Sequence, residues 1–339
     1  MSKEFTNKGQ IKTSAIFALV LVFLGGVGGG YIYANHSIIT PPVSEILREN
    51  SSKYRFINPI YIAGDRLDIS SSEYTPLQNG LNIFIGDAER SGDVKDVSVY
   101  FRDLYSGRWT GVNENDKYAP GSMLKVAVLL GYLKLGEDKP TLLDERYQYD
   151  PVVDSGQFFT PQKMLAQGPE RVGDLLKNMI INSDNAATLL LIDKNQQAVD
   201  EVYQDLRLPL PEGAIDFMSA KSYSVLWRVL YNGTYLSKNL SEQAMTLLSL
   251  TSFKDGLVAG LPEGVRIAHK FGEHTDDKPG QEAVHELHDC GIIYPKNKNP
   301  YFLCVMTRGN NFDSLKTVIQ GASKLVYNDV MTNEQLLSK

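Results

Sequence analysis

A serine and a lysine stand three residues apart in the stretch GSMLKV, where Ser122 precedes Lys125 at the start of an apolar run. A serine hydroxyl is a weak nucleophile at neutral pH and needs a base within hydrogen-bond reach. On a helix this spacing places both side chains on one face, one turn apart. The lysine can act as that base if burial or a nearby cation lowers its pKa. Alone, the pair favours the simpler interpretation, a helix cap followed by a solvated lysine.

Two further polar motifs follow along the chain. The triplet 183–185, Ser-Asp-Asn, lies between two apolar helical stretches. Its side chains could point inward, or the triplet could simply cap a helix, because these are the best capping residues. Lys270 is followed by Phe271 and Gly272 in a segment with a strand pattern on either side. A lysine at a strand edge could hold a carboxylate while the glycine lets the backbone approach the ligand closely.

The elements that must position these motifs predict an α+β domain. Alternating residues in VSVYF (97–101), followed by RWTGV (108–112), indicate a hairpin near the start of the domain. CGIIY (290–294) and YFLCVM (301–306) indicate a second hairpin near its end. We expect these strands to meet in one antiparallel sheet flanked by helices, with an all-helical subdomain formed by the helix-rich middle, about 122–253.

Two amphipathic stripes support the helical part of this prediction. Each stripe recurs at the spacing that places apolar residues on one helix face. The first consists of Val172, Leu175, Leu176, Met179 and Ile180. The second, near the end of the chain, consists of Leu315, Val318, Ile319, Ala322, Leu325 and Val326.

Taken together and in this order, the three motifs resemble those of the class A β-lactamases, members of the penicillin-recognising serine hydrolases. The elements of that family are S-x-x-K, S-D-N and K-T-G. The first two match here, and the third differs at its middle position, Phe271. The 61 residues that separate Ser122 from Ser183 are typical of the family pattern. The resemblance covers about residues 76–330.

The resemblance implies a role for each matching residue. Ser122 would attack a carbonyl carbon and become acylated, and Lys125 would help to take its proton. Ser183 would relay a proton toward the leaving nitrogen. Asn185 would hydrogen-bond the amide side chain of the substrate, and Lys270 would supply positive charge for its carboxylate.

The resemblance also implies an oxyanion site between the backbone N–H groups of Ser122 and Glu273, next to Gly272. Losing one such donor typically costs about 10²–10³ in rate, so the backbone around these residues matters. No cofactor and no metal is expected.

The sequence departs from the family in the interval 197–230, which is shorter than the family's and contains no E-x-x-L-N motif for the glutamate that activates the deacylating water. Glu212 and Asp216 are the carboxylates that could replace it, or they are solvated turn residues. Without such a base an acyl-enzyme forms and then hydrolyses slowly. Phe271 removes a hydroxyl that would bind the substrate carboxylate, or it is a core residue on the other face of the strand, with the strand register locally shifted.

A cluster of histidines invites a metal hypothesis. Its members, within twenty residues or so, are His269, His274, His285 and His288, beside Glu282, Glu286 and Asp289. The two histidines of HELH are three residues apart, whereas the zinc-protease motif requires H-E-x-x-H. We therefore expect a polar, glycine-containing surface loop and no metal site.

The N-terminal residues predict a membrane anchor. Three lysines precede the uncharged segment 14–34, which would span about 32 Å as a helix. The positive flank would keep the N-terminus in the cytoplasm. We expect a cytoplasmic tail at 1–12, an anchor at 13–34, a juxtamembrane stalk at 35–75 and an extracytoplasmic domain at 76–339. A cleaved signal peptide is the alternative.

Bulk properties narrow the function classes. The formal net charge of −6 provides no basic surface for nucleic acid. The chain has two cysteines, Cys290 and Cys304, which could form one bridge or remain buried thiols. The expected partners are the membrane and a β-lactam or a peptidoglycan peptide, while the oligomeric state is left open.

The sequence thus predicts a membrane-anchored serine hydrolase acylated by β-lactams or D-Ala-D-Ala-like peptides. Two alternatives remain. One is a D,D-peptidase-like penicillin-binding protein with slow deacylation. The other is a catalytically silent cell-wall binding module, against which the matching first two motifs argue.

Overall fold

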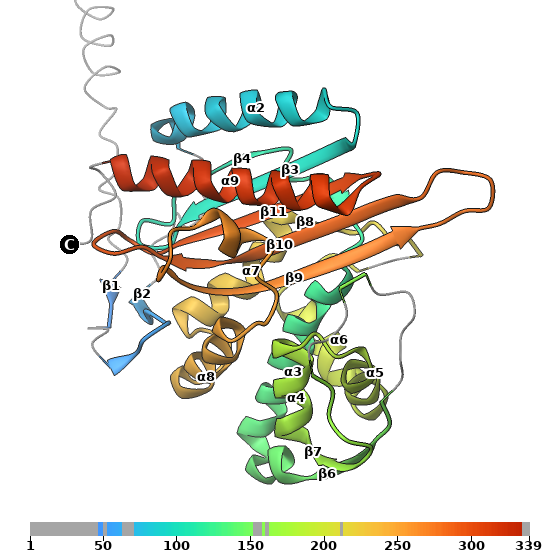
Figure 1. Ribbon diagram of the computed structural model, residues 1–339. Helices are drawn as coiled ribbons and strands as arrows, with labels where there is room; N and C mark the ends of the chain where they lie inside the picture. Colours follow the sequence, from blue (N-terminus) through green and yellow to red (C-terminus); the bar gives the residue numbers. More distant parts are fainter. Residues whose placement is uncertain are drawn as a thin grey trace, which may run out of the picture. The chain divides into compact units, whose positions relative to one another are not determined.

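The computed structural model describes residues 47–49, 53–62, 71–151, 158–159, 163–210 and 213–333. Within this part of the chain a five-stranded antiparallel sheet carries helices on both faces, and a helical lobe lies beside one edge of the sheet (Figure 1). The fold is therefore of the predicted α+β class.

The sheet joins strands from the two ends of the domain. Its order is β4-β3-β11-β10-β9, and all neighbours are antiparallel. The strands are β3 (Val94–Asp103), β4 (Trp109–Val112), β9 (Arg266–Asp276), β10 (Val284–Tyr294) and β11 (Tyr301–Gly309). The prediction that the N-terminal hairpin meets the C-terminal hairpin is confirmed by the pairing of β3 with β11.

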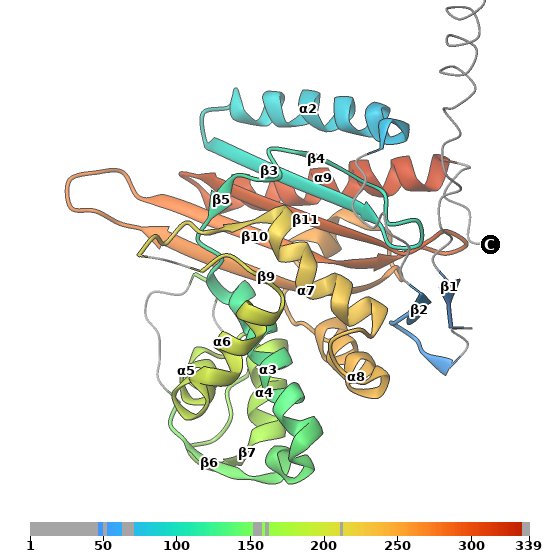
Figure 2. The ribbon, with the colours of Figure 1, turned by 180° about the vertical axis from the view of Figure 1, so that it is seen from behind.

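Two helices, α2 (Thr75–Glu89) and α9 (Phe312–Thr332), cover one face of the sheet (Figure 1). The alternation in β3 directs Val97, Val99 and Phe101 to this face, where they pack with the apolar side of α9. The opposite face carries α7 (Ala220–Asn232), and α8 (Lys238–Ser249) packs near β9 (Figure 2). Burial of apolar residues on both faces explains why these strands contain long apolar runs.

The helical lobe holds the first two sequence motifs. Its main helices are α3 (Lys125–Asp138), α4 (Val172–Ile181), α5 (Asn185–Lys194) and α6 (Gln196–Asp205). The predicted stripe on α4 is buried in full. The predicted all-helical subdomain is wrong in this respect: a two-stranded antiparallel sheet of β6 (Arg146–Tyr149) and β7 (Gly168–Arg171) lies at the far end of the lobe (Figure 1).

Short elements complete the connections. They are β1 (Leu47–Arg48), β2 (Ile60–Ile62), β5 (Lys117–Tyr118), β8 (Met218–Ser219) and the 3₁₀ turns η2 (Ser72–Tyr74), η3 (Gly121–Leu124), η4 (Pro140–Asp144) and η5 (Leu257–Gly260). β5 pairs with β8, so the segment that precedes η3 is paired with the segment that precedes α7.

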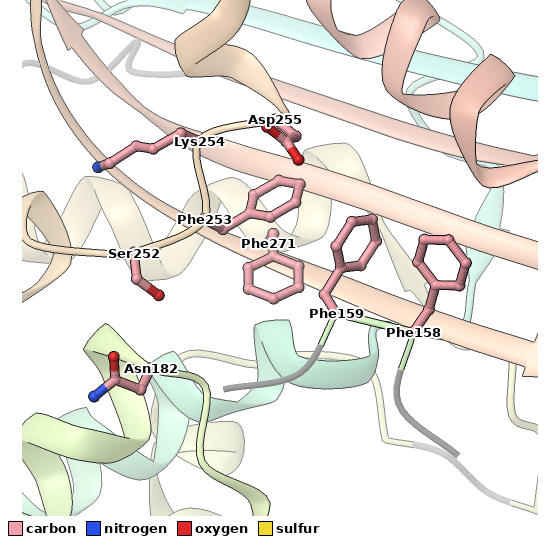
Figure 3. Close-up of a pocket in the computed structure, with 8 residues that line it drawn as sticks. All are labelled: Phe158, Phe159, Asn182, Ser252, Phe253, Lys254, Asp255 and Phe271. Atoms are coloured by element: carbon pink, nitrogen blue, oxygen red, sulfur yellow. The ribbon is translucent and has the colours of Figure 1, made fainter. Parts of the chain in front are cut away.

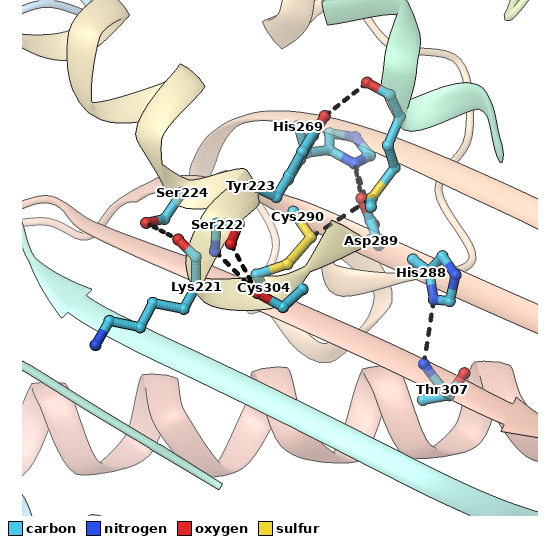
Figure 4. Close-up of a disulfide and its surroundings, with 12 residues drawn as sticks. Lys221, Ser222, Tyr223, Ser224, His269, His288, Asp289, Cys290, Cys304 and Thr307 are labelled. Atoms are coloured by element: carbon cyan, nitrogen blue, oxygen red, sulfur yellow. Dashed lines mark hydrogen bonds and ion pairs between the residues drawn. A yellow bond between two sulfur atoms is a disulfide. The ribbon is translucent and has the colours of Figure 1, made fainter. Parts of the chain in front are cut away.

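The second hairpin is longer than predicted. β10 begins at Val284, six residues before the expected start, because it stays paired with β9 as far as Asp276. The expected surface loop of histidines is therefore wrong: His269 and His288 are fully buried in the sheet. The imidazole Nδ1 of His269 lies 2.9 Å from a carboxylate oxygen of Asp289, and His288 bridges β11 and Ala119 (Figure 4).

The two cysteines lie directly opposite each other in the β10–β11 ladder and form a disulfide (Figure 4). Of the two alternatives that the sequence left open, the bridge is the one found.

Part of the expected stalk packs on the domain. Phe56 and Ile57 are buried against the sheet and α8, and the carboxylate of Glu242 accepts the backbone N–H groups of residues 55–57. The expected anchor at 13–34 lies outside the described residues. None of the helices that the structure does describe is long and apolar enough to cross a membrane.

Candidate active site

The predicted site residues converge where the helical lobe meets the sheet. Ser122 lies in η3, Lys125 opens α3, Ser183 lies in the turn from α4 to α5, and Lys270 lies on β9. A cleft of about 340 Å³ opens here. Its lining residues are Gly121, Ser122, Leu124, Lys125, Asn185, Thr188, Ile192, Glu273, His274 and Thr275.

Ser122 does not stand inside an α-helix as predicted but in the 3₁₀ turn that leads into α3. In a 3₁₀ turn residues i and i+3 eclipse each other, so the pair still faces one side. The amine of Lys125 lies 2.8 Å from the hydroxyl of Ser122. The predicted contact between nucleophile and base is thus present in the geometry.

The amine of Lys125 is buried and surrounded by oxygen atoms. Besides Ser122 Oγ, it contacts the carbonyl of Ser183 at 2.7 Å, Ser183 Oγ at 3.0 Å and Asn185 Oδ1 at 2.6 Å. An ammonium has three N–H donors. With four oxygen atoms around it, the amine can exchange a proton with a hydroxyl without any movement of the backbone.

The turn that carries Ser183 is held in an uncommon conformation. Ser183 has φ = 57°, in the left-handed region that residues other than glycine rarely adopt. Such strain persists only where the surroundings fix it, and it concentrates at functional sites. Here it directs the Ser183 hydroxyl between two amines, those of Lys125 and Lys270, each 3.0 Å away.

Asp184 holds that turn in place. Its carboxylate caps α5 through the N–H of Ala187 and accepts hydrogen bonds from Tyr149 and Asn178. Both interpretations of the triplet are therefore found together: its aspartate caps a helix, while the serine and asparagine point into the site.

Lys270 is completely buried on β9. Its amine donates to Ser183 Oγ and to the carbonyl of Phe271. Burial, together with the nearby charge of Lys125, holds the pKa of Lys270 well below its ordinary value.

Phe271 is a core residue, as one of the two interpretations proposed. It is about 5% exposed, and its ring stacks on Phe253 at 4.2 Å between centroids. The local register shift expected with that interpretation is not found, because β9 stays in register with β10 through this position. Its ring centroid nevertheless lies 4.3 Å from the amine of Lys270, so the aromatic ring borders the site.

Two glycines let β9 touch η3. A Cβ on Gly272 would lie 2.3 Å from the carbonyl oxygen of Pro120, and one on Gly121 would lie 2.3 Å from that of Glu273. Gly121 also has φ = 50°, which favours glycine. The backbone of Ser122 is therefore adjacent to that of Glu273, where the family resemblance expects the oxyanion site.

The carboxylate of Glu273 accepts the N–H of Phe159 at 3.2 Å, and burial raises its pKa although the lysines oppose this. Of the cleft-lining residues that the structure describes, Glu273 is the one that carries a carboxylate.

Of the two carboxylates considered as replacements for the family's glutamate, Asp216 does not line the cleft. Asp216 pairs with Arg308 at 2.6 Å and lines a different cavity with Glu286. Glu212 lies outside the described residues. Throughout the described ranges there is no group of three or more His, Cys, Asp or Glu that could hold a metal ion.

Sequence reasoning missed part of the site. Thr188, His274 and Thr275 line the cleft, and Tyr149 and Asn178 anchor Asp184. Thr188 lies one helix turn after Asp184 on α5, and this spacing is a usable signal. His274 and Thr275 become recognisable only when β9 is known to extend past Glu273.

Comparison with known proteins agrees with this geometry. The sequence model of the family described as "Beta-lactamase enzyme family" matches residues 81–330. None of the curated proteins matches the sequence significantly. Among solved structures, PBP-A is similar, with a TM-score of 0.62 and 22% identity over 76% of this chain and 97% of that chain.

Two class A β-lactamases are comparably similar. The enzyme from Mycobacterium abscessus has a TM-score of 0.61 and 20% identity over 74% of this chain and 98% of that chain. The last common ancestor of Gram-negative bacteria β-lactamases has a TM-score of 0.61 and 22% identity over 74% and 99%. At these identities the likeness shows the fold.

Proposed function

Because this chain belongs to the beta-lactamase enzyme family, we propose that it is a serine hydrolase in which Ser122 is acylated by β-lactams or by D-Ala-D-Ala-like cell-wall peptides. The observation that carries the proposal is the 2.8 Å contact between the Lys125 amine and the Ser122 hydroxyl, at the floor of an open cleft. A buried lysine that reaches a serine in this way has no need of a histidine base.

Acylation uses the groups in sequence. Lys125 takes the proton of Ser122 as Oγ attacks the carbonyl carbon. The oxyanion is stabilised by the N–H groups of Ser122 and Glu273, beside Gly272. Ser183, in contact with both lysines, passes a proton to the leaving nitrogen. Asn185 orients the acyl side chain.

Release of the acyl group is slow in this proposal. The family's E-x-x-L-N motif is missing from the interval 197–230, and Asp216 is engaged by Arg308. Glu273 is tied to the backbone of Phe159 rather than directed at Ser122. The balance therefore favours the D,D-peptidase-like alternative, a penicillin-binding protein that acylates efficiently and turns over slowly. One of the similar solved structures is an acyl-enzyme complex of a PBP-A mutant with penicillin G, which fits this behaviour.

The protein works outside the cytoplasm on a single-pass anchor. The support is the uncharged segment 14–34 behind three lysines. Extraction of membranes with carbonate tests this: an anchored protein stays with the membrane, and deletion of residues 1–34 releases it. A mature N-terminus just after residue 34 would instead indicate a cleaved signal peptide.

Intact-mass measurement of the full chain in detergent, incubated with a penicillin, tests the catalytic proposal. We expect an adduct of one penicillin that forms in the wild type and is absent in Ser122→Ala. Lack of any adduct with penicillin and with a D-alanyl thioester would favour the silent binding module.

A further inference from the structure

A second cavity, of about 310 Å³, is bordered by residues next in sequence to Ser183 and Lys270. We call it the aromatic pocket (Figure 3). Its lining residues are Phe158, Phe159, Asn182, Ser252, Phe253, Lys254, Asp255 and Phe271. None of the residues to which we assign a catalytic role is among them.

Phenylalanine rings form its main wall. Phe253 stacks on Phe271, and the ring of Phe159 meets Phe253 edge-on at 5.0 Å between centroids. The rings come from β9, from the segment after α8 and from residues 158–159, so three separate parts of the chain build one aromatic surface. Aromatic rings prefer these edge-on and stacked arrangements, and a further ring can join them.

The pocket adjoins the groups that handle the leaving part of the substrate. Asn182 precedes Ser183, and Phe271 follows Lys270. Ser183 and Lys270, whose side chains contact each other, are therefore the immediate sequence neighbours of two residues of the pocket. Since Ser183 is the proposed proton donor to the leaving atom, the group attached to that atom lies toward the aromatic pocket.

The charges around the pocket do not favour a carboxylate. Lys270 is fully buried, and its amine is already engaged by Ser183 and the carbonyl of Phe271. Lys254 extends away from the rings (Figure 3) and donates to the carbonyl of Thr251 at 2.6 Å. Asp255 also lines the pocket, so the lining carries one cationic and one anionic side chain.

From these observations we infer that the aromatic pocket binds an apolar, aromatic group on the leaving side of the substrate. The inference rests on the proposed function and adds to its substrates acyl donors with an aromatic leaving group. With a benzyl thioester, the bond from Ser122 Oγ to the carbonyl carbon forms and the carbon–sulfur bond breaks. The proton of Ser122 passes through Lys125 and Ser183 to the departing thiolate, so the step needs no other reactant.

Three benzoyl-D-alanyl thioesters, identical in their acyl part, test the inference on the full chain. Their leaving thiols are benzyl mercaptan, methanethiol and mercaptoacetate. After correction for uncatalysed hydrolysis, we expect kcat/KM for the benzyl donor to exceed that for the methyl donor by roughly tenfold or more, from burial of the ring. Equal values, or a preference for the mercaptoacetate donor, would overturn the inference.

A variant that fills the aromatic pocket provides a second test of the inference. Ser252 is half-buried, and its side chain faces the pocket, so Ser252→Trp fills the space without removing a core residue (Figure 3). The benzyl-to-methyl ratio should fall toward one. Ser249→Trp, a change at a half-buried serine on α8 outside the pocket, is the matched control and should keep the ratio. A ratio that survives Ser252→Trp contradicts the inference.

Different results would overturn the proposed function and the inference about the aromatic pocket. If neither penicillin nor any of the three thioesters acylates Ser122, the proposed function is wrong, and the inference falls with it. If penicillin acylates Ser122 and none of the thioesters does, only the inference is wrong. If all three acylate Ser122 without the benzyl preference, only the inference is wrong.

Discussion

Two regions of this molecule contrast sharply: the groups that would form an acyl-enzyme and the segment that would have to release it. In the first, Ser122, Lys125, Ser183 and Lys270 are linked by contacts of 2.8–3.0 Å across three parts of the chain. In the second, the segment before α7 directs Asp216 to Arg308 and toward a different cavity.

The difference indicates that the two half-reactions have separate structural requirements. Acylation needs a nucleophile, a base and a proton relay in a packed, mostly buried cluster. Deacylation needs a base aimed at a water on the acyl carbon. The groups that acylation needs come from η3, the α4–α5 turn and β9. The base that deacylation needs depends on a segment in which this chain departs from its family.

The largest effect is expected for a substitution that blocks formation of the acyl-enzyme. Lys125→Ala should lower the rate of penicillin adduct formation by about 10³-fold or more, because it removes the base and empties a site lined by four oxygen atoms. Stopped-flow or quenched mass spectrometry measures the rate. Lys134→Ala, an exposed change on the same helix, is the control. A rate in Lys125→Ala within tenfold of wild type would remove Lys125 from the mechanism.

The next largest effect is expected for the aspartate that holds the acylating groups in place. Asp184→Ala should lower the free energy of unfolding by about 3 kcal/mol, because it deletes a helix cap and leaves Tyr149 and Asn178 without a buried acceptor. Urea denaturation measures this loss. Asp193→Ala, on the exposed side of the same helix α5, should change stability by less than about 0.5 kcal/mol. Similar losses in both variants would contradict the assigned anchoring role.

The buried amine of Lys270 predicts a pH dependence of stability. Because its folded pKa lies well below its unfolded value near 10.5, the unfolded state binds more protons between these two values. Stability therefore rises with pH through that window, by up to about 1.4 kcal/mol per pH unit, and is constant with respect to this group below the folded pKa.

Lys270→Met should flatten that rise while reducing acylation. Denaturation midpoints of both proteins across the alkaline range provide the measurement. Identical slopes for wild type and variant would show that Lys270 is protonated in the folded state.

The smallest effect is expected for a substitution in the segment considered for deacylation. Asp216→Asn should leave both acylation and deacylation within about twofold of wild type, because Asp216 lies outside the cleft and its pair with Arg308 is partly exposed. Decay of the penicillin adduct, followed by mass, measures deacylation. A slowing of tenfold or more would identify Asp216 as the missing base and undo the contrast between the two regions.

The parts of the fold that could be predicted are those with a local signal. Alternation in VSVYF (97–101) located β3, and the spacing of Leu175, Leu176 and Met179 located the buried face of α4. The pair proposed as nucleophile and base was recognisable because Ser122 and Lys125 are close in sequence, and Ser183 and Lys270 because their motifs occur in a known order.

The remainder depends on contacts between distant residues. His269 and His288 look like surface residues in sequence, yet partners on neighbouring elements, such as Asp289 and the carbonyl of Ala119, allow them to be buried. Likewise, Phe159 and Phe271 are 112 positions apart, so no local sequence pattern predicts the aromatic pocket.

A burst experiment tests the central claim, rapid acylation of Ser122 followed by slow release, most directly. The full chain is mixed with an excess of a chromogenic cephalosporin, and product is followed from milliseconds to hours. The account predicts a burst equal to one product per Ser122, then a steady state at least about a hundredfold slower, with both phases absent in Ser122→Ala. A linear time course without a burst, at a rate that depends on Ser122, would show that release keeps pace with acylation and would contradict the account.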